Sequence, residues 1–146
     1  MKQLLFPIAI ISATLFSCQK QNSTDRTHLS LDGKWRMIIV KDNISRMTMT
    51  KPSSIQGDVD ITFTTVNAPN GTFIGNTPTN NIGLNNFYVG PNQAITIPVL
   101  SMTKVMETSW GNEFVDNIRN SQEYNFEAGN RLNIKTTSKI LTFQKL

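Results

Sequence analysis

Two carboxylates, Asp58 and Asp60, form the most suggestive pair of residues for catalysis. Alternate residues of a strand point to the same side, so both would lie on one face, and paired carboxylates can act as general acid and general base. They alternate, however, with Val59 and Ile61, whose apolar side chains point to the opposite face. We therefore interpret Asp58 and Asp60 as part of a solvated outer face and not as a catalytic pair.

Nucleophilic and metal chemistry lack the necessary partners in this sequence. The chain has one His, at position 28, and one Cys, at position 18, which excludes a multi-histidine or thiolate metal site. A Ser or Thr nucleophile needs an adjacent base, and only a lysine-based arrangement around Lys104 could supply one. The sequence therefore predicts no catalytic residues, no metal, no cofactor and no enzymatic activity.

The Asn-rich segment 76–86 is the best candidate for recognition. An Asn side chain offers both hydrogen-bond donors and acceptors, and binding residues are concentrated in loops. The candidate binding residues are Asn76, Thr79, Asn80, Asn81, Asn85 and Asn86. A tight connection rich in turns would use the same residue types, and both interpretations stay open.

The N-terminus is typical of an export signal. Lys2 is followed by 13 mostly apolar residues, 4–16, too few to span a bilayer, which needs roughly 20. Ser17 then precedes Cys18, an arrangement that resembles the bacterial lipobox, in which a peptidase cuts before a cysteine that carries lipid. We expect residues 1–17 to be a lipoprotein signal peptide and Cys18 to be the site of lipid attachment. The alternative is a buried, free Cys18 at the end of a core helix.

The residues after Cys18 predict where the domain is held. Residues 18–30 are polar, include His28, and are expected to form a lipid-anchored flexible tether. Gln19 stands where Asp would resemble an inner-membrane retention signal, and no acidic run resembling a surface-export signal follows. The sequence thus predicts an outer-membrane lipoprotein that faces the periplasm, attached to the membrane through acylated Cys18. The export route excludes nucleic acid as a partner, and we expect a monomer.

From residue 31 onward the hydrophobic pattern mostly has the period of two that is typical of strands. Trp35, Met37 and Ile39 form one alternating series. Turn residues at 70–71, 90–92, 128–130 and 136–138 separate further strands, the first as an Asn70–Gly71 hairpin turn, and residues 139–145 form the last strand. Pro98 cannot donate to a sheet, so the strand around it should lie at an edge.

One segment has helical spacing instead. Trp110, Phe114, Val115 and Ile118 form an apolar stripe, and Thr108 or Ser109 can cap its start. With 146 residues the chain suffices for one domain. We expect a mainly β (α+β) domain over 31–146, a small antiparallel curled sheet or partly open barrel with one packed helix. Its aromatic core should contain Trp35, Phe63, Tyr88, Trp110, Phe114 and Phe126.

From Asp58 to Leu146 the order of these features resembles the META domain family, whose HslJ-like members are heat-shock lipoproteins. The resemblance rests on segments 61–63, 75–80, 87–89, 95–97, 101–104, 124–126, 132–134 and 141–143, and on Asp32-Gly33-Lys34-Trp35 as the opening strand. That opening is shared with lipocalin-like domains. Many members carry a Cys in the first loop and a second Cys later; here Pro78-Thr79-Asn80 and the stretch around Met106 stand in those places, so that disulfide is absent.

The resulting functional hypothesis is a non-enzymatic envelope lipoprotein with an interaction or envelope-maintenance role. A lipocalin-like carrier of a small ligand is the first alternative, and an inhibitor of an envelope-directed hydrolase such as lysozyme is the second. Arg131, Lys135, Lys139 and Lys145 add a basic final hairpin, which could dock on an anionic lipid or polymer. A carrier requires a cavity of about 300 Å³ or more, whereas an interaction module can be packed solid.

Overall fold

The computed structural model describes residues 30–128 and 130–146. The predicted signal peptide, the lipidation site Cys18 and His28 lie outside the described residues. Within the described part, no helix has the length and apolar character needed to cross a membrane.

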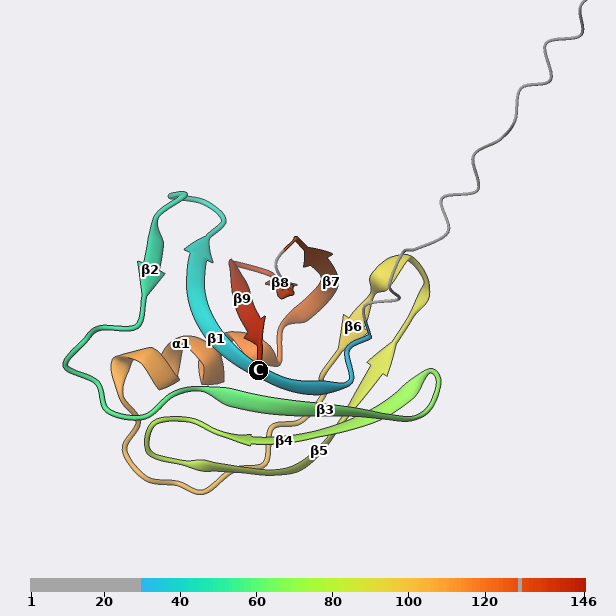
Figure 1. Cartoon of the computed structure of the whole chain (residues 1–146), viewed down its shortest axis with the longest axis horizontal. Helices are drawn as coiled ribbons and strands as arrows, with labels where there is room; N and C mark the ends of the chain where they lie inside the picture. Colours follow the sequence, from blue (N-terminus) through green and yellow to red (C-terminus); the bar gives the residue numbers. More distant parts are fainter. Residues whose placement is uncertain (1–29, 129) are drawn as a thin grey trace, which may run out of the picture.

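The described chain forms one antiparallel sheet that curls into a nearly closed barrel (Figure 1). The strands follow the order β6-β5-β4-β3-β1-β9-β8-β7, and β2 pairs with β1. A bridge between Ala94 and Glu123 brings the two ends of the sheet together. The elements are β1 (Gly33–Asp42), β2 (Thr48–Thr50), β3 (Asp60–Asn67), β4 (Asn70–Asn76), β5 (Asn81–Val89), η1 (Pro91–Gln93), β6 (Ile95–Thr96), α1 (Ser109–Ile118), β7 (Ser121–Glu127), β8 (Arg131–Thr136) and β9 (Lys139–Lys145). The predicted fold class, mainly β with one packed helix, is confirmed.

Strand β1 organises the sheet because it is paired along both edges. It pairs with β9 on one side, and with β3 and then β2 on the other. The register on β9 shifts between Met37 and Ile39, so the buried residues are Trp35, Met37 and then Val40. The predicted regular alternation is therefore wrong at Ile39, because a bulge changes which side chains face inward.

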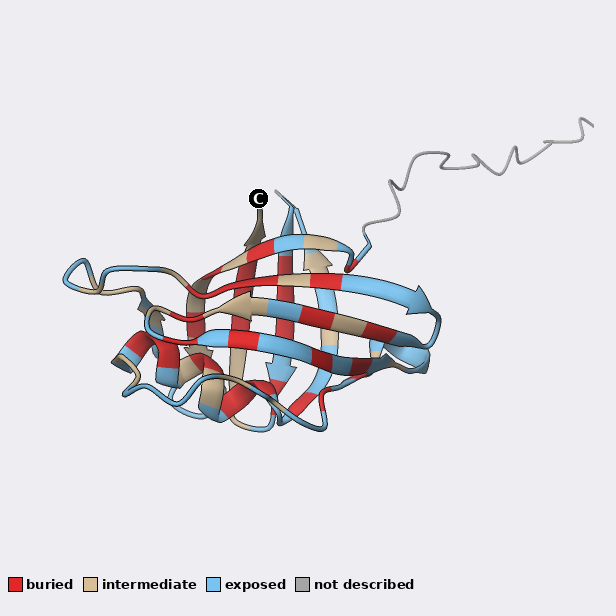
Figure 2. Cartoon of the chain, turned by 90° about the horizontal axis from the view of Figure 1, so that it is seen from below, coloured by how far each residue is buried: buried red, intermediate tan, exposed pale blue. Residues whose placement is uncertain are grey.

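Aromatic side chains fill the barrel interior. Figure 2 shows buried residues alternating with exposed ones along several strands, as expected for a sheet with one inner face. The fully buried rings are Trp35, Trp110, Phe63, Phe73, Phe87, Phe114 and Phe143. Phe63 packs edge-on against Phe87, with ring centroids 5.1 Å apart. The prediction for Tyr88 is wrong: its side chain is 44% exposed, because Phe87 takes the inward position at this point of β5.

Helix α1 packs its apolar stripe onto the barrel core. Trp110, Phe114 and Ile118 are fully buried, and Phe114 meets Phe143 of β9 edge-on at 6.4 Å. Thr108 caps the helix, as predicted, since its hydroxyl accepts a hydrogen bond from the Gly111 amide at 3.1 Å. The helix is thus held at both its start and its buried face.

The β3–β4 hairpin forms, but its turn differs from the prediction. Asn70 and Gly71 belong to β4, and the chain reverses just before them, at Ala68 and Pro69. Gly71 does not form the turn. It leaves space for a neighbouring side chain, because a Cβ atom at this position would lie 2.2 Å from the ring of Phe87. The sequence pattern Asn-Gly therefore marks a place where a ring of the next strand occupies the space of a side chain.

We expect Gly71→Ala to lower the free energy of unfolding by about 1–3 kcal/mol, because the Phe87 ring must move to admit the methyl group. Gly83→Ala, on β5, is the matched control, since its Cβ would meet nothing closer than 3.7 Å. That control should be neutral or slightly stabilising. Urea unfolding followed by fluorescence measures both, and equal effects at the two positions would contradict this account of Gly71.

Candidate functional site

A row of four polar residues crosses the outer face of the barrel. Arg36 of β1 is paired with Asp60 of β3, Asp60 with Asn76 of β4, and Asn76 with Asn81 of β5. Paired residues of adjacent antiparallel strands point to the same face. The backbone register alone thus brings together side chains up to 45 positions apart in the sequence.

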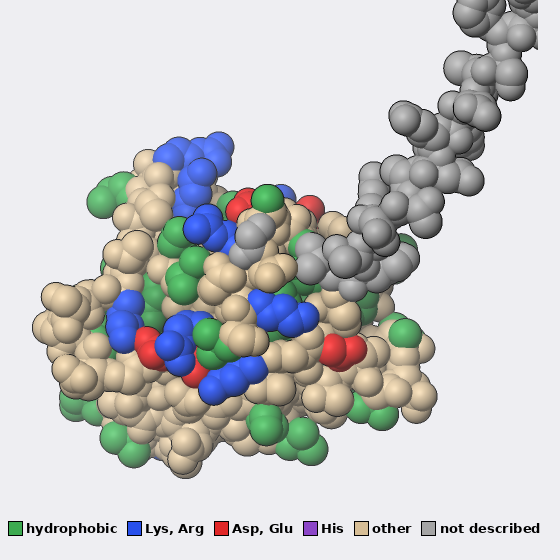
Figure 3. Space-filling model, viewed as in Figure 1, with side chains coloured by type: hydrophobic (Ala, Val, Ile, Leu, Met, Phe, Trp, Pro, Cys, Tyr) green, Lys and Arg blue, Asp and Glu red, His purple; other side chains and the backbone are tan. Residues whose placement is uncertain are grey.

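Ion pairs hold the carboxylates of this row. Asp60 accepts hydrogen bonds from Arg36 Nε at 2.8 Å and Nη2 at 3.0 Å, and Lys34 Nζ lies 3.2 Å from it. Asp58 lies 3.1 Å from Arg36 Nη1 and 2.6 Å from Lys51 Nζ. Figure 3 shows basic side chains, with fewer acidic ones among them, over the middle of this face. Three cations surround two carboxylates, which gives the network a net positive charge.

The prediction that Asp58 and Asp60 belong to a solvated face is wrong for Asp60, which is buried in this network of ion pairs. The Asp60 side chain is only 7% exposed. The hydrogen bond from Arg36 lowers the pKa of Asp60 and, with help from Lys34, outweighs the opposing effect of burial. Because Asp60 stays ionised, it is not suited to donate a proton as a general acid. Arg36, Lys34 and Lys51 were not singled out from the sequence, since only strand pairing places them around these two aspartates.

A groove of about 430 Å³ lies alongside this row. Lys34, Thr62, Ile74 and Asn81 are among its lining residues, and they come from β1, β3, β4 and β5. Among the described residues, the side chains of Thr62 and Asn81 make no hydrogen bond to another group. The groove therefore offers unused amide and hydroxyl groups and an ammonium group beside the exposed apolar surface of Ile74.

The predicted Asn-rich site divides into two groups. Asn76, Asn81 and Asn86 lie on the outer face of β4 and β5. Thr79, Asn80 and Asn85 instead form hydrogen bonds within the protein. Asn80 and Asn85 are buried, and Asn85 accepts from the Ser101 amide at 2.6 Å, whereas Thr79 is exposed and donates to Glu107 at 2.9 Å. The segment is mostly strand, because β4 ends at Asn76 and β5 begins at Asn81. Sequence spacing alone could not separate the two groups.

Asn80 is the centre of a buried polar cluster. Its amide nitrogen donates to the Val105 carbonyl and to Glu107, both at 2.9 Å. Its oxygen accepts from the Val105 amide at 2.7 Å and the Thr103 hydroxyl at 3.0 Å. Asn80 thus satisfies backbone groups of the long connection 97–108 and ties that connection to the β4–β5 turn.

Glu107 is the second member of this cluster and was missed in the sequence. Burial alone would raise the pKa of Glu107, but hydrogen bonds from Thr77, Asn80, Thr79 and the Thr108 amide together lower it. The only signal in the sequence is a lone acid in the otherwise uncharged stretch 105–112. Its role is structural, because its carboxylate oxygens already accept several internal hydrogen bonds.

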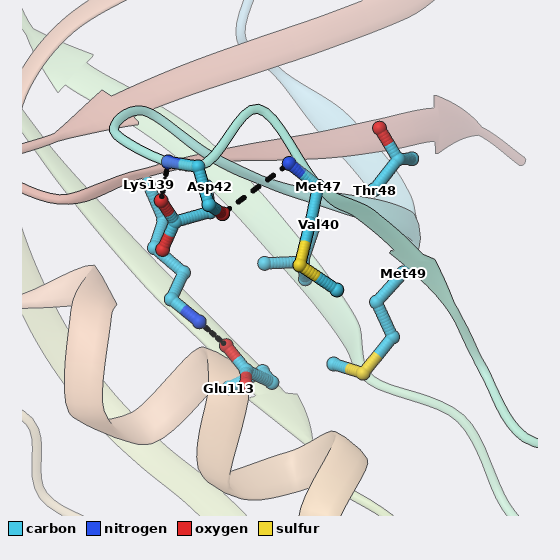
Figure 4. A pocket seen from close by; sticks show the side chains of 8 residues that line it. Val40, Asp42, Met47, Thr48, Met49, Glu113 and Lys139 are labelled. Atoms are coloured by element: carbon cyan, nitrogen blue, oxygen red, sulfur yellow. Dashed lines mark hydrogen bonds and ion pairs between the residues drawn. The ribbon is translucent and has the colours of Figure 1, made fainter.

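A second hollow, of about 360 Å³, lies between the β1–β2 hairpin and helix α1. Figure 4 shows Val40, Met47 and Met49 beside the ion pair of Lys139 and Glu113. The two charged atoms of that pair are 2.8 Å apart. The hollow therefore has an apolar wall next to a fixed pair of charges.

The remaining charged candidates do not gather into a site. Lys139 pairs with Glu113, and Lys135 lies 3.5 Å from Glu123. Lys145 lies over the Trp35 ring, 5.2 Å from its centroid, so the final hairpin is not a continuous basic surface. Within residues 30–128 and 130–146, Lys104 forms no hydrogen bond or ion pair, and no group of three metal-binding side chains occurs.

Comparison with known proteins identifies no relative. A scan against protein-family models finds no match, and searches of curated proteins and of solved structures find none either. The functional argument for this chain therefore depends on its own residues and geometry.

We expect Asn80→Ala to lower the free energy of unfolding by about 2–3 kcal/mol, because it leaves the Val105 amide and Glu107 with fewer partners in a buried place. Asn86→Ala removes an exposed amide from the outer face of β5 and should change stability by less than about 0.5 kcal/mol. Thermal unfolding of the two variants measures the difference. Equal stability of the two would mean that Asn80 does not hold the connection.

The lowered pKa values of Asp60 and Glu107 predict a loss of stability in acid. As the pH falls, the unfolded chain takes up protons at these groups before the folded chain does, so stability present above about pH 4.5 declines below it. Glu107→Gln should be less stable at neutral pH and should show a shallower decline in acid. Urea unfolding between neutral pH and pH 3 tests this, and an unchanged pH dependence in the variant would contradict it.

Proposed function

We propose that this protein is a lipid-anchored, non-enzymatic protein of the bacterial cell envelope, and that its β domain binds a partner through the outer-face groove. The groove is the surface around Lys34, Thr62, Ile74 and Asn81. Its free polar groups would select the partner, and Ile74 would add apolar contact.

The packing of the interior is the single observation that carries the proposal. Seven fully buried aromatic side chains occupy the inside of the barrel, where a lipocalin-like carrier would hold its ligand. Recognition by this domain is then a property of its surface. On that surface the groove combines a fixed network of charges with hydrogen-bonding groups that have no internal partner.

The envelope location and the META domain family belong to the same proposal. The support for the location is the apolar N-terminal segment followed by Ser17 and Cys18, with the polar stretch 19–30 after it. The support for the family is the order of residue segments between Asp58 and Leu146, together with a mainly antiparallel barrel that carries one helix. We propose an outer-membrane lipoprotein that faces the periplasm.

A small-ligand carrier is the second candidate, and the hollow between the β1–β2 hairpin and α1 favours it. At about 360 Å³ this hollow exceeds the roughly 300 Å³ that a small-molecule site needs. A ligand there would lie outside the barrel, against Met47 and Met49. An added mass that persists in native mass spectrometry of the purified protein would favour this candidate.

A photoreactive amino acid placed at Asn81 in cells tests the proposed binding surface. We expect crosslinking to a specific envelope component, and we expect Lys34→Glu to reduce it, because Lys34 lines the same groove. Asn112 is the matched control, an exposed Asn on α1 away from the groove. If the captured component is a hydrolase such as lysozyme, the partner is an enzyme to be inhibited. Equal crosslinking at Asn81 and Asn112, or none at either, would contradict the proposed surface.

A further inference from the structure

The tip of the β1–β2 hairpin, residues 43–47, stands clear of the barrel (Figure 1). Ile44 is 88% exposed and Met47 is 73% exposed. Figure 3 shows hydrophobic and basic side chains together on this projection. Ile44 therefore projects into solvent from the tip, whereas Met47, although exposed, lines the mouth of the hollow between the hairpin and α1.

Hydrogen bonds hold the tip in this shape. The Asp42 carboxylate accepts from the Ile44 amide at 2.9 Å and the Ser45 amide at 2.7 Å. The Asp42 backbone also bonds to Arg46 at 3.1 Å and to Met47 at 2.9 Å. Because the turn is fixed by these bonds, Ile44 is held pointing outward and does not fold back onto the barrel.

Arg46 occupies a backbone conformation that suits another residue type. Its φ angle is +62°, in the left-handed region that Gly and Asn adopt more easily than Arg. Within the described part of the chain, Arg46 and Lys41 form no ion pair. The exposed isoleucine contributes little to stability through burial, and the left-handed backbone of Arg46 has a cost, while the Arg46 side chain has no ion-pair partner in the described part of the chain.

The charges around the tip favour a negatively charged partner. Lys41 and Arg46 are cations without an ion-pair partner, and Asp42 is the one carboxylate in residues 41–47, so the tip carries a net charge of +1. Glu113, in the hollow below the hairpin, is paired with Lys139. A surface that is apolar at its tip and positive around it matches the interface of an anionic bilayer, where apolar groups enter and cations meet headgroups.

We propose that the β1–β2 hairpin tip inserts Ile44 into the surface of an anionic lipid membrane. This inference rests on the proposed lipid anchor, which would keep the domain beside a bilayer. The 13 residues from Cys18 to Ser30 are joined by 12 steps and can span roughly 40 Å when extended, which is a reach sufficient for docking. In Figure 1, β3, β4 and β5 lie on the side of the molecule away from the tip, so docking would leave the outer-face groove open to a partner.

The test uses the mature protein purified from cells, carrying Ser45→Cys labelled with an environment-sensitive fluorophore. Acylation would block the sulfur of Cys18, the only native cysteine, and intact mass shows whether Cys18 carries lipid. Protein is combined with phosphatidylcholine vesicles with or without phosphatidylglycerol, and iodide quenching reports exposure of the label to water. Ser53→Cys, in the exposed loop between β2 and β3, is the matched label position.

We expect quenching at position 45 to fall severalfold on vesicles that contain phosphatidylglycerol, and quenching at position 53 to stay unchanged. Ile44→Ser should abolish the protection, whereas Met106→Ser, at a methionine that is 90% exposed elsewhere, should not. Arg46→Gly relieves the backbone strain, so it should be at least as stable as the parent and yet less protected. A loss of protection in Arg46→Gly without a loss of stability would therefore be an effect on membrane docking and not on folding.

Equal quenching at position 45 with both kinds of vesicle, or equal protection at positions 45 and 53, would overturn the docking proposal. So would protection of position 45 that occurs only in native envelope fragments, because a protein would then occupy the tip. An unmodified Cys18 in the intact mass would contradict the anchor. In that case the same label positions are read on added vesicles in a Cys18→Ser background, so failure of the anchor and failure of docking give different results.

Discussion

The barrel has to be filled, and this constraint explains most of the remaining structure. Seven aromatic rings occupy the space enclosed by a sheet in which β1 is paired along both edges. Because the rings are large, the backbone leaves space for them at Gly71, which has no side chain opposite the Phe87 ring. A bulge in β1 places Val40 in the inward position after Met37. Helix α1 contributes two of the seven rings. The side chains of the interior are therefore close-packed, and their packing stabilises the fold.

Two clusters show how the fold satisfies buried polar groups. Asn80 and Glu107 join the β4–β5 turn to the long connection before α1, and Arg36 and Asp60 pair across β1 and β3. Both arrangements consist of charged or amide groups with several partners, as burial of such groups requires. The two differ in surroundings: the Glu107 cluster is closed by its own hydrogen bonds, whereas the Asp60 network borders a groove in which Asn81 and Thr62 keep unused polar groups.

The proposed functions use opposite sides of the molecule. The outer-face groove lies on β1, β3, β4 and β5, and the hairpin tip projects on the other side (Figure 1). A domain held at a membrane by its hairpin would present the groove to the periplasm. The left-handed backbone of Arg46 costs some stability, which a well-filled core can offset.

The sequence by itself determined most of the strand and helix pattern, the start of α1 at Thr108 or Ser109 and the mainly antiparallel class, because these depend on local periodicity and turn chemistry. It also indicated the Asn-rich segment, but not which of its residues face outward. Only the tertiary structure decided that Asn81 borders the groove while Asn80 is buried, and that Arg36, Lys34 and Lys51 surround Asp58 and Asp60. Strand register and bulges set these neighbours, and register depends on contacts between segments distant in the sequence, which no local pattern contains.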